Sequence, residues 1–198
     1  KYPYAFTLKI GYKLTGNKIQ VMWEVSNNDG KTMYFQIGAH PAFYYPDFNP
    51  DTEERGAFRL YKRGENGEMK PLETLKYILI SEKGCADTEH VYELETPEGK
   101  LPLTTSTFDR DALIIENQQV SKVVLESCAG EPFVSVEFDS PALGMWSPAG
   151  LNAPFVCIEP WYGRCDRKGF TGPLDEKDLV NALAPGQVFR TGYTIEVF

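Results

Sequence analysis

The sequence predicts an all-β protein built as a large antiparallel β-sandwich. Apolar and polar residues alternate at both ends of the chain, over residues 6–14 and residues 189–197, which is the period of a half-buried strand. Turn-rich segments separate such runs, as antiparallel hairpins require. The sequence shows neither a persuasive helix of three turns nor a repeat of solenoid length.

The first elements read clearly in chain order. Residues 6–14 alternate, Gly16 and Asn17 turn the chain, and residues 19–25 alternate again, so we expect an antiparallel hairpin. A turn at residues 27–30 then leads into an apolar, strand-like run. That run delivers His40, one of only two histidines in the chain.

The middle of the chain is less informative. Residues 46–100 contain weak strands at residues 57–61 and 91–94 among turn-rich segments. His90 follows charged residues there, and we interpret it as a solvated surface histidine. We assign no chemistry to this part.

The last third of the chain again predicts strands. Residues 120–127 and 133–138 form an expected pair, followed by a short strand at residues 143–146. A long connection, residues 162–185, has leucines four apart that favour a short helix over residues 175–183. The alternating run to Phe198 closes the chain.

Size and composition favour a folded globule. The chain has 198 residues, 42% of them hydrophobic and 13% aromatic, which suffices for a substantial core. We therefore expect residues 1–198 to form a single domain.

The charge balance narrows the possible partners. A net charge of -8 with a pI near 4.9 disfavours nucleic acid and anionic membrane surfaces, so a small neutral ligand fits better. No run of eighteen apolar residues and no signal-peptide core occurs in the sequence. The four cysteines lack C-x-x-C spacing and read as reduced thiols, so we expect a cytoplasmic protein: Cys85, Cys128, Cys157 and Cys165.

Residues 38–46, GAHPAFYYP, are the first candidate for a functional site. Histidine exchanges protons near neutral pH, and Pro41 keeps His40 in an extended backbone. Phe43 and the two tyrosines after it offer an aromatic platform that suits a sugar. The alternative is a hydrogen-bonded core histidine at a strand end.

Residues 155–166, FVCIEPWYGRCD, repeat this design. Four apolar residues end in Glu159, which is followed by proline and then by Trp161. A carboxylate placed after an apolar run is costly to bury without a partner or a task. A glutamate held by backbone amides is the alternative. Cys157 reads as core filler rather than as a nucleophile.

These two motifs, with FDRDALIIEN at residues 108–117 and LGMWSP at residues 143–148 between them, resemble the aldose 1-epimerases. Within the galactose mutarotase-like superfamily, the likeness is closest to the LacX-type branch. Four motifs in order make a more specific match than any one of them. The rest of the chain is compatible but less diagnostic.

The resemblance implies the galactose mutarotase-like supersandwich fold. Members of the family usually carry further strands before the segment that here reads YPYAF, and those strands contribute a second site histidine and a sugar-binding arginine. Neither has a counterpart in this sequence. We therefore expect the chain to be an N-terminally truncated form of the catalytic domain.

The resemblance also implies an activity, the interconversion of the α and β anomers of an aldohexose. Glu159 is then the base and His40 the acid, with their roles reversed on ring closure. Asp111 falls where the family hydrogen-bonds sugar hydroxyls, although an ordinary turn before a strand explains it equally well. Phe43, Trp146 and Trp161 are the candidate rings for sugar contact, with core packing the alternative for Trp146.

We expect no organic cofactor, since one carboxylate and one imidazole suffice for this chemistry. With two histidines and scattered cysteines, we also expect no zinc or copper site built by the protein. Nucleotide-binding and hydrolase motifs such as G-x-G-x-x-G and G-x-S-x-G do not occur. A basic cluster, Arg164, Arg167 and Lys168, favours a phosphorylated sugar, unless it is only a solvated loop.

Two other functions remain open from the sequence. A carbohydrate-binding module without catalysis fits a chain that lacks the upstream residues of the family. A glycoside hydrolase needs two carboxylates across the scissile bond, which Glu159 and Asp111 could supply. The sequence does not indicate the oligomeric state.

Overall fold

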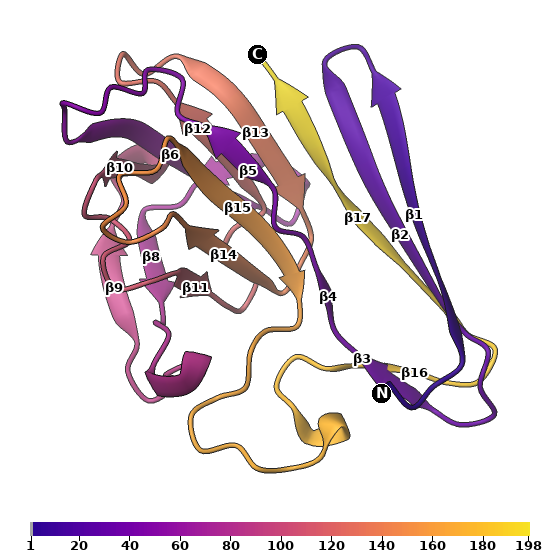
Figure 1. The fold of residues 1–198 in the computed structure, drawn as a ribbon. Helices are drawn as coiled ribbons and strands as arrows, with labels where there is room; N and C mark the ends of the chain where they lie inside the picture. The colour runs from indigo at the N-terminus through magenta and orange to yellow at the C-terminus, as the bar shows by residue number, and fades with distance from the viewer. Residues whose placement is uncertain (1) are drawn as a thin grey trace.

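The computed structural model describes residues 2–198, apart from the side chain of Glu82. These residues form antiparallel β-sheets joined by turns and loops (Figure 1). The predicted all-β class is therefore confirmed. No helix among the described residues is long and apolar enough to cross a membrane.

The larger sheet has eight strands in the order β1-β2-β17-β13-β12-β6-β10, and β7 pairs with β6. The closing strand β17 thus lies between the N-terminal hairpin and the middle of the chain. The bounds are β1 Phe6–Thr15, β2 Lys18–Asn27, β6 Glu54–Arg63, β7 Met69–Pro71, β10 Lys100–Thr104, β12 Lys122–Glu126, β13 Pro132–Phe138 and β17 Val188–Val197.

The smaller sheet has five strands, and β15 is its central strand. β14 pairs along one side of β15, and the two short strands β4 and β5 pair along the other. The bounds are β4 Ile37–Gly38, β5 Ala42–Tyr44, β11 Leu113–Ile115, β14 Ala142–Trp146 and β15 Phe155–Tyr162.

Two two-stranded ladders and three short 3-10 turns complete the described structure. β3 Met33–Phe35 pairs with β16 Asn181–Leu183, and β8 Thr74–Tyr77 pairs with β9 Tyr92–Glu95. The 3-10 turns are Glu82–Gly84, Pro97–Gly99 and Leu174–Glu176.

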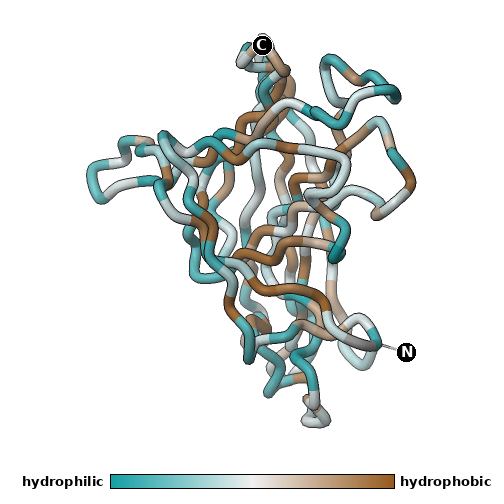
Figure 2. The backbone as a smooth tube through the Cα atoms, turned by 90° about the vertical axis from the view of Figure 1, so that its left-hand side faces the viewer, coloured by the Kyte–Doolittle hydropathy of each residue, from teal (hydrophilic) through white to brown (hydrophobic). Residues whose placement is uncertain are grey.

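The main core lies between the two sheets. The larger sheet supplies Phe58 and Leu125, and the smaller sheet supplies Met145 and Ile158, all of them buried in one cluster. Figure 2 shows apolar segments gathered along the central strands, with hydrophilic loops at the periphery. Because successive side chains of a strand point to opposite faces, the other face of β15 carries Cys157, Glu159 and Trp161.

The structure confirms the predicted N-terminal hairpin, in which Phe6 pairs with Asn27 and Thr15 with Lys18. The helix predicted over residues 175–183 is wrong. Only Leu174–Glu176 forms a helical turn, and Leu179 has a left-handed backbone with a φ of 56°. Asn181–Leu183 instead pairs with β3, so sheet hydrogen bonding overrides the leucine spacing.

Candidate functional site

The two proline-containing motifs become neighbouring antiparallel strands. Gly38 of β4 is paired with Trp161, and Ala42 of β5 is paired with Cys157. His40 lies midway between Gly38 and Ala42, and Glu159 lies midway between their partners. The register therefore places His40 directly opposite Glu159.

The two prolines explain why this paired stretch is divided into β4 and β5. The Ala39 N–H donates to the carbonyl oxygen of Pro160 at 3.0 Å, and the Ile158 N–H donates to that of Pro41 at 3.3 Å. Neither proline has an N–H to return the second bond of its pair. The ladder is thus weakened on both sides of His40, but its register is kept.

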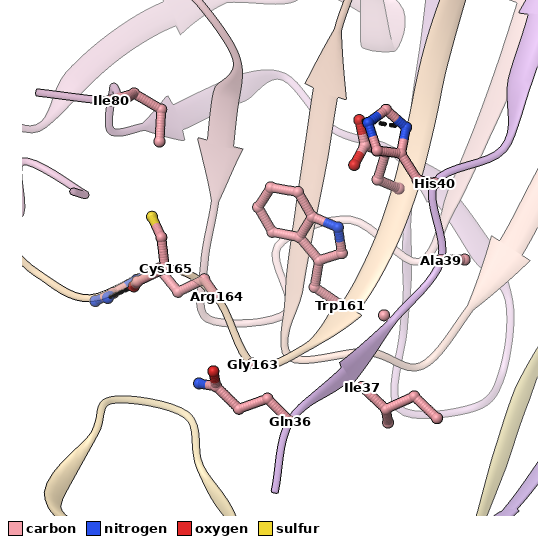
Figure 3. Close-up of a pocket in the computed structure, with 11 residues that line it drawn as sticks. Gln36, Ile37, Ala39, His40, Ile80, Trp161, Gly163, Arg164 and Cys165 are labelled. Atoms are coloured by element: carbon pink, nitrogen blue, oxygen red, sulfur yellow. Dashed lines mark hydrogen bonds and ion pairs between the residues drawn. The ribbon is translucent and has the colours of Figure 1, made fainter. Parts of the chain in front are cut away.

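His40 and Glu159 occupy the position between these two hydrogen-bonded pairs, where facing side chains approach most closely. The Nδ1 atom of His40 lies 3.3 Å from Oε1 of Glu159, and a dashed line marks this contact at His40 in Figure 3. The contact joins residues 119 positions apart (159 minus 40).

The two side chains differ strongly in their exposure to water. The side chain of Glu159 is 5% exposed, whereas that of His40 is 61% exposed. Burial raises the pKa of Glu159 to about 7, and polar contact with the indole of Trp161 offsets part of that rise. The carboxyl group can therefore exchange a proton near neutral pH.

Trp161 extends into the site because two glycines leave room for it. A Cβ atom at Gly38 would lie 2.7 Å from the indole, and one at Gly144 would lie 2.4 Å from it. Trp146 packs edge-on to His40 with ring centroids 5.7 Å apart. Both tryptophans predicted from the sequence thus lie beside the His40–Glu159 pair.

His40, Glu159 and Trp161 line a cavity of about 480 Å³, whereas Trp146 is not among its lining residues. Figure 3 shows Trp161 near its centre, with His40 at one end and Arg164 and Cys165 at the other. The lining residues are Gln36, Ile37, Gly38, Ala39, His40, Ile80, Glu159, Trp161, Gly163, Arg164 and Cys165. A cavity of this size suits a small-molecule ligand.

Arg164 is buried in the cavity wall, where two carboxylates balance its charge. Its Nε lies 2.5 Å from Glu116, and its Nη2 lies 2.7 Å from Asp178. Asp178 also pairs with Arg167 at 2.5 Å. Of the predicted basic cluster, Arg164 lines the cavity, whereas Arg167 and Lys168 are not among the lining residues.

Phe43 and Asp111 are not among the described residues that line this cavity. Phe43 is paired with Val156 and packs against the main core, because strand alternation turns it away from His40. Tyr44, 70% exposed, is on the face of His40 instead. Asp111 forms a turn with a φ of 74°, and its Oδ1 accepts the Ala112 N–H at 2.7 Å.

The site also contains a residue that sequence reasoning set aside. Cys157 is buried, as expected for core filler, but it is on the same face of β15 as Glu159. Its sulfur, the Glu159 carboxylate and the His40 imidazole lie within 4.8 Å of one another. The two-residue spacing of Cys157 and Glu159 was the available signal.

Comparison with known proteins identifies the family of this chain. The family model for aldose 1-epimerase matches residues 1–169. The chain belongs to the aldose 1-epimerase family. It is 28% identical to the chromosomal LacX protein of Lactococcus lactis subsp. lactis, over 99% of this chain and 63% of LacX.

Solved structures of related proteins have the same fold as this aldose 1-epimerase family member. A galactose mutarotase-related enzyme from Lactobacillus acidophilus matches with a TM-score of 0.85 and 29% identity. A galactose mutarotase-like protein from Lactobacillus casei matches with a TM-score of 0.84 and 25% identity. All of this chain is covered in both cases, but only 63% and 65% of those chains.

Proposed function

We propose that this chain is an aldose 1-epimerase that interconverts the α and β anomers of an aldohexose, with Glu159 and His40 as its proton-transfer pair. The observation that carries the proposal is the direct contact of a buried carboxylate with an exposed imidazole, 3.3 Å apart, at one cavity. Family membership supports the reaction class.

The proposed reaction needs one base and one acid. Glu159 takes the proton from the C1 hydroxyl while His40 protonates the ring oxygen, and the bond between C1 and the ring oxygen breaks to give the open-chain aldehyde. Rotation about the C1–C2 bond presents the other face of the carbonyl. Ring closure then runs the two proton transfers in reverse, so neither group is consumed.

The surroundings of each group suit its proposed role. Burial raises the pKa of Glu159 to about 7, so its carboxylate is a stronger base than an exposed glutamate. His40 is exposed and can exchange its proton with water between turnovers. We infer that Trp161, which lines the cavity, stacks on the apolar face of the sugar ring, whereas Trp146 supports the His40 ring from the side.

The charges around Arg164 in the cavity wall favour a neutral sugar over a phosphorylated one. The guanidinium of Arg164 already has two carboxylate partners, which leaves little net positive charge for a phosphate. We therefore propose an unphosphorylated aldohexose as the substrate.

A binding module without catalysis is the second candidate. The cavity suits a small-molecule ligand whether or not the His40–Glu159 pair transfers protons. The chain spans 63% of its LacX relative. A glycoside hydrolase has less support, because Glu159 is the only carboxylate among the described residues lining the cavity.

One-dimensional NMR of anomeric protons tests the proposal directly. Magnetisation exchange between the α and β signals is measured for glucose, galactose and glucose 6-phosphate, with and without the protein. We expect faster exchange for at least one of the neutral sugars. Sugar binding without faster exchange selects the binding-module function.

A further inference from the structure

The proton-transfer mechanism leaves Cys157 without a role. Its sulfur lies on the same face as Glu159 and completes a group of three different ligand types, imidazole nitrogen, thiol sulfur and carboxylate oxygen, within 4.8 Å of one another. Cys157 and Glu159 are buried, and His40 is exposed. Two of the three ligand groups are therefore fixed in the protein interior, and the third is in contact with solvent.

The spacing of these atoms resembles the edge of a zinc coordination tetrahedron. Two ligands bound at about 2.0–2.1 Å with tetrahedral angles lie roughly 3.3–3.4 Å apart. The Nδ1 of His40 and Oε1 of Glu159 are already 3.3 Å apart. A thiolate at about 2.3 Å from zinc lies roughly 3.6 Å from its neighbours. The Cys157 sulfur lies within 4.8 Å of both atoms, so zinc binding draws it toward the pair.

We propose that His40, Cys157 and Glu159 form a binding site for Zn²⁺, with the fourth position open to the cavity. Nitrogen and sulfur ligands select zinc over Mg²⁺ or Ca²⁺, which prefer oxygen. Zinc binds the thiolate and the neutral imidazole, so any proton on either group is released to solvent. Water completes the coordination at the exposed side of His40.

Zinc at this position occupies both groups of the proton-transfer pair. The imidazole nitrogen facing Glu159 and the carboxylate oxygen facing His40 become ligands and no longer move protons. Zn²⁺ therefore inhibits anomer exchange, a consequence that rests on the proposed function. Metal binding itself does not depend on it and is measured separately.

The chain offers matched controls for a binding experiment. Asp87, Glu89 and His90 form a second group with possible metal ligands, but it contains no sulfur and is largely exposed. Cys128 is an exposed free thiol outside the cavity. Variants His90→Asn and Cys128→Ser thus report binding at accessible side chains elsewhere.

Zinc affinity is measured by competition with a chromophoric chelator, and Co²⁺ serves as a spectroscopic substitute. We expect the parent protein, His90→Asn and Cys128→Ser to bind Zn²⁺ alike and to show a sulfur-to-cobalt charge-transfer band. Cys157→Ser should lose that band and bind Zn²⁺ about tenfold more weakly or worse. Equal zinc affinity of Cys157→Ser and the parent would overturn the proposal.

Two measurements keep the proposal testable if Cys157→Ser does not fold. NMR of the parent protein, which has only two histidines, should show the His40 imidazole signals shifting with Zn²⁺ and the His90 signals unchanged. A shift confined to His90, or absence of the cobalt band in the parent, contradicts the site. Where anomer exchange is detected, zinc should suppress the exchange and EDTA should restore it. The exchange catalysed by Cys157→Ser should be less sensitive to zinc.

Discussion

Glu159 and His40 are in contact but differ in their exposure to water. The carboxylate is 5% exposed and the imidazole 61% exposed, so desolvation acts mainly on the Glu159 carboxylate. Burial disfavours the charged form of a carboxyl group and raises its pKa. The proposed base is thus tuned toward neutral pH by its place in β15, beside a partner that remains in contact with water.

The pH dependence of exchange should report this tuning. As the pH falls below about 7, Glu159 takes up a proton and ceases to be a base, so the catalysed rate should fall up to about tenfold per pH unit. The rate is measured by NMR after subtraction of the protein-free rate at each pH. An acid limb with its midpoint near 4.5, the ordinary value for glutamate, would contradict the role of burial.

The same pKa makes a prediction about stability. Because its pKa is raised in the folded state, the contribution of Glu159 to folding stability is fully present below pH 4.5. That contribution is lost as the pH rises through about 7. Glu159→Gln carries no charge to bury. The unfolding free energy of Glu159→Gln, relative to that of the parent, should therefore increase by up to about 3 kcal/mol between pH 4.5 and pH 8.

Urea denaturation at pH 5 and at pH 8 measures that difference. Polar contact with the Trp161 indole favours the ionised carboxylate, but burial outweighs it and the pKa remains raised. A parent protein that gains stability over Glu159→Gln as the pH rises would show that the carboxylate is well solvated or fully compensated in the folded state.

At the residue scale, the sequence could predict that His40 and Glu159 lie together better than it could predict which way neighbouring side chains point. His40 and Glu159 each follow an apolar run and precede a proline, and this shared pattern anticipated their contact. Phe43 was chosen for its ring, but the alternation of β5 turns it toward the main core, where it is half-buried, and exposes Tyr44 on the site face. Cys157 was assigned to the core without regard to its register with Glu159.

At the scale of elements, the site depends on how closely neighbouring strands approach the indole of Trp161. Gly144 of β14 leaves the space that the ring fills. Gly144→Ala places a methyl group 2.4 Å from the ring, so the indole must move. We expect a loss of about 1–3 kcal/mol in unfolding free energy and weaker sugar binding.

Chemical denaturation and sugar titration followed by NMR check this expectation. Gly30→Ala is the matched control, because a Cβ there meets no atom within 4 Å. Equal stability and equal sugar binding for the two variants would mean that the indole does not need its present position.

Arg164 ties the connection after β15 to the end of β11. Its side chain is 3% exposed and pairs with Glu116 and Asp178. Arg164→Met leaves two carboxylates without their partner and should cost about 3 kcal/mol of unfolding free energy. Thermal and urea denaturation measure this loss.

Arg190→Met serves as the comparison for that variant. Arg190 also pairs with a carboxylate, Glu24, at 2.9 Å, but its side chain is 66% exposed. Its removal should cost at most about 1 kcal/mol. Similar losses for the two arginine variants would show that burial gives the Arg164 network no special weight.

Element prediction succeeded where local alternation and a turn define a hairpin, and it failed where tertiary pairing decides. The half-buried state expected for residues 6–14 is wrong, because β1 is exposed along nearly its whole length. The hairpin β1–β2 alternates clearly along both strands, and the structure confirms it. The leucine spacing of residues 175–183 indicated a helix, yet Asn181–Leu183 pairs with β3. No local pattern reveals that partner, since β3 lies about 150 residues earlier in the chain.

At the scale of the whole molecule, two packed sheets bring distant motifs together. The larger sheet covers one face of β14 and β15, which leaves their other face to form the cavity. The family resemblance predicted the mutarotase-like form of this sandwich, whereas composition indicated only a folded globule and strand periodicity an all-β protein. The strand order that places β17 between β2 and β13 is not visible in any single segment.

The outer strand β1 leaves an apolar stripe in contact with water. Tyr12 is 71% exposed and Leu14 is 73% exposed, whereas Val21 of the adjacent strand β2, the partner of Tyr12, is buried.

The chain spans 63% of its LacX relative. The proposed activity must therefore be measured on this chain itself.

The most direct test compares anomer exchange in the parent protein, Glu159→Gln and His40→Asn. Each substitution nearly keeps the shape of its side chain and removes one proton-transfer group. Both variants should remain folded and bind sugar, with exchange rates lowered on the order of a hundredfold to ten-thousandfold. Two folded variants that exchange anomers as fast as the parent would contradict the assignment of this pair as the catalytic centre.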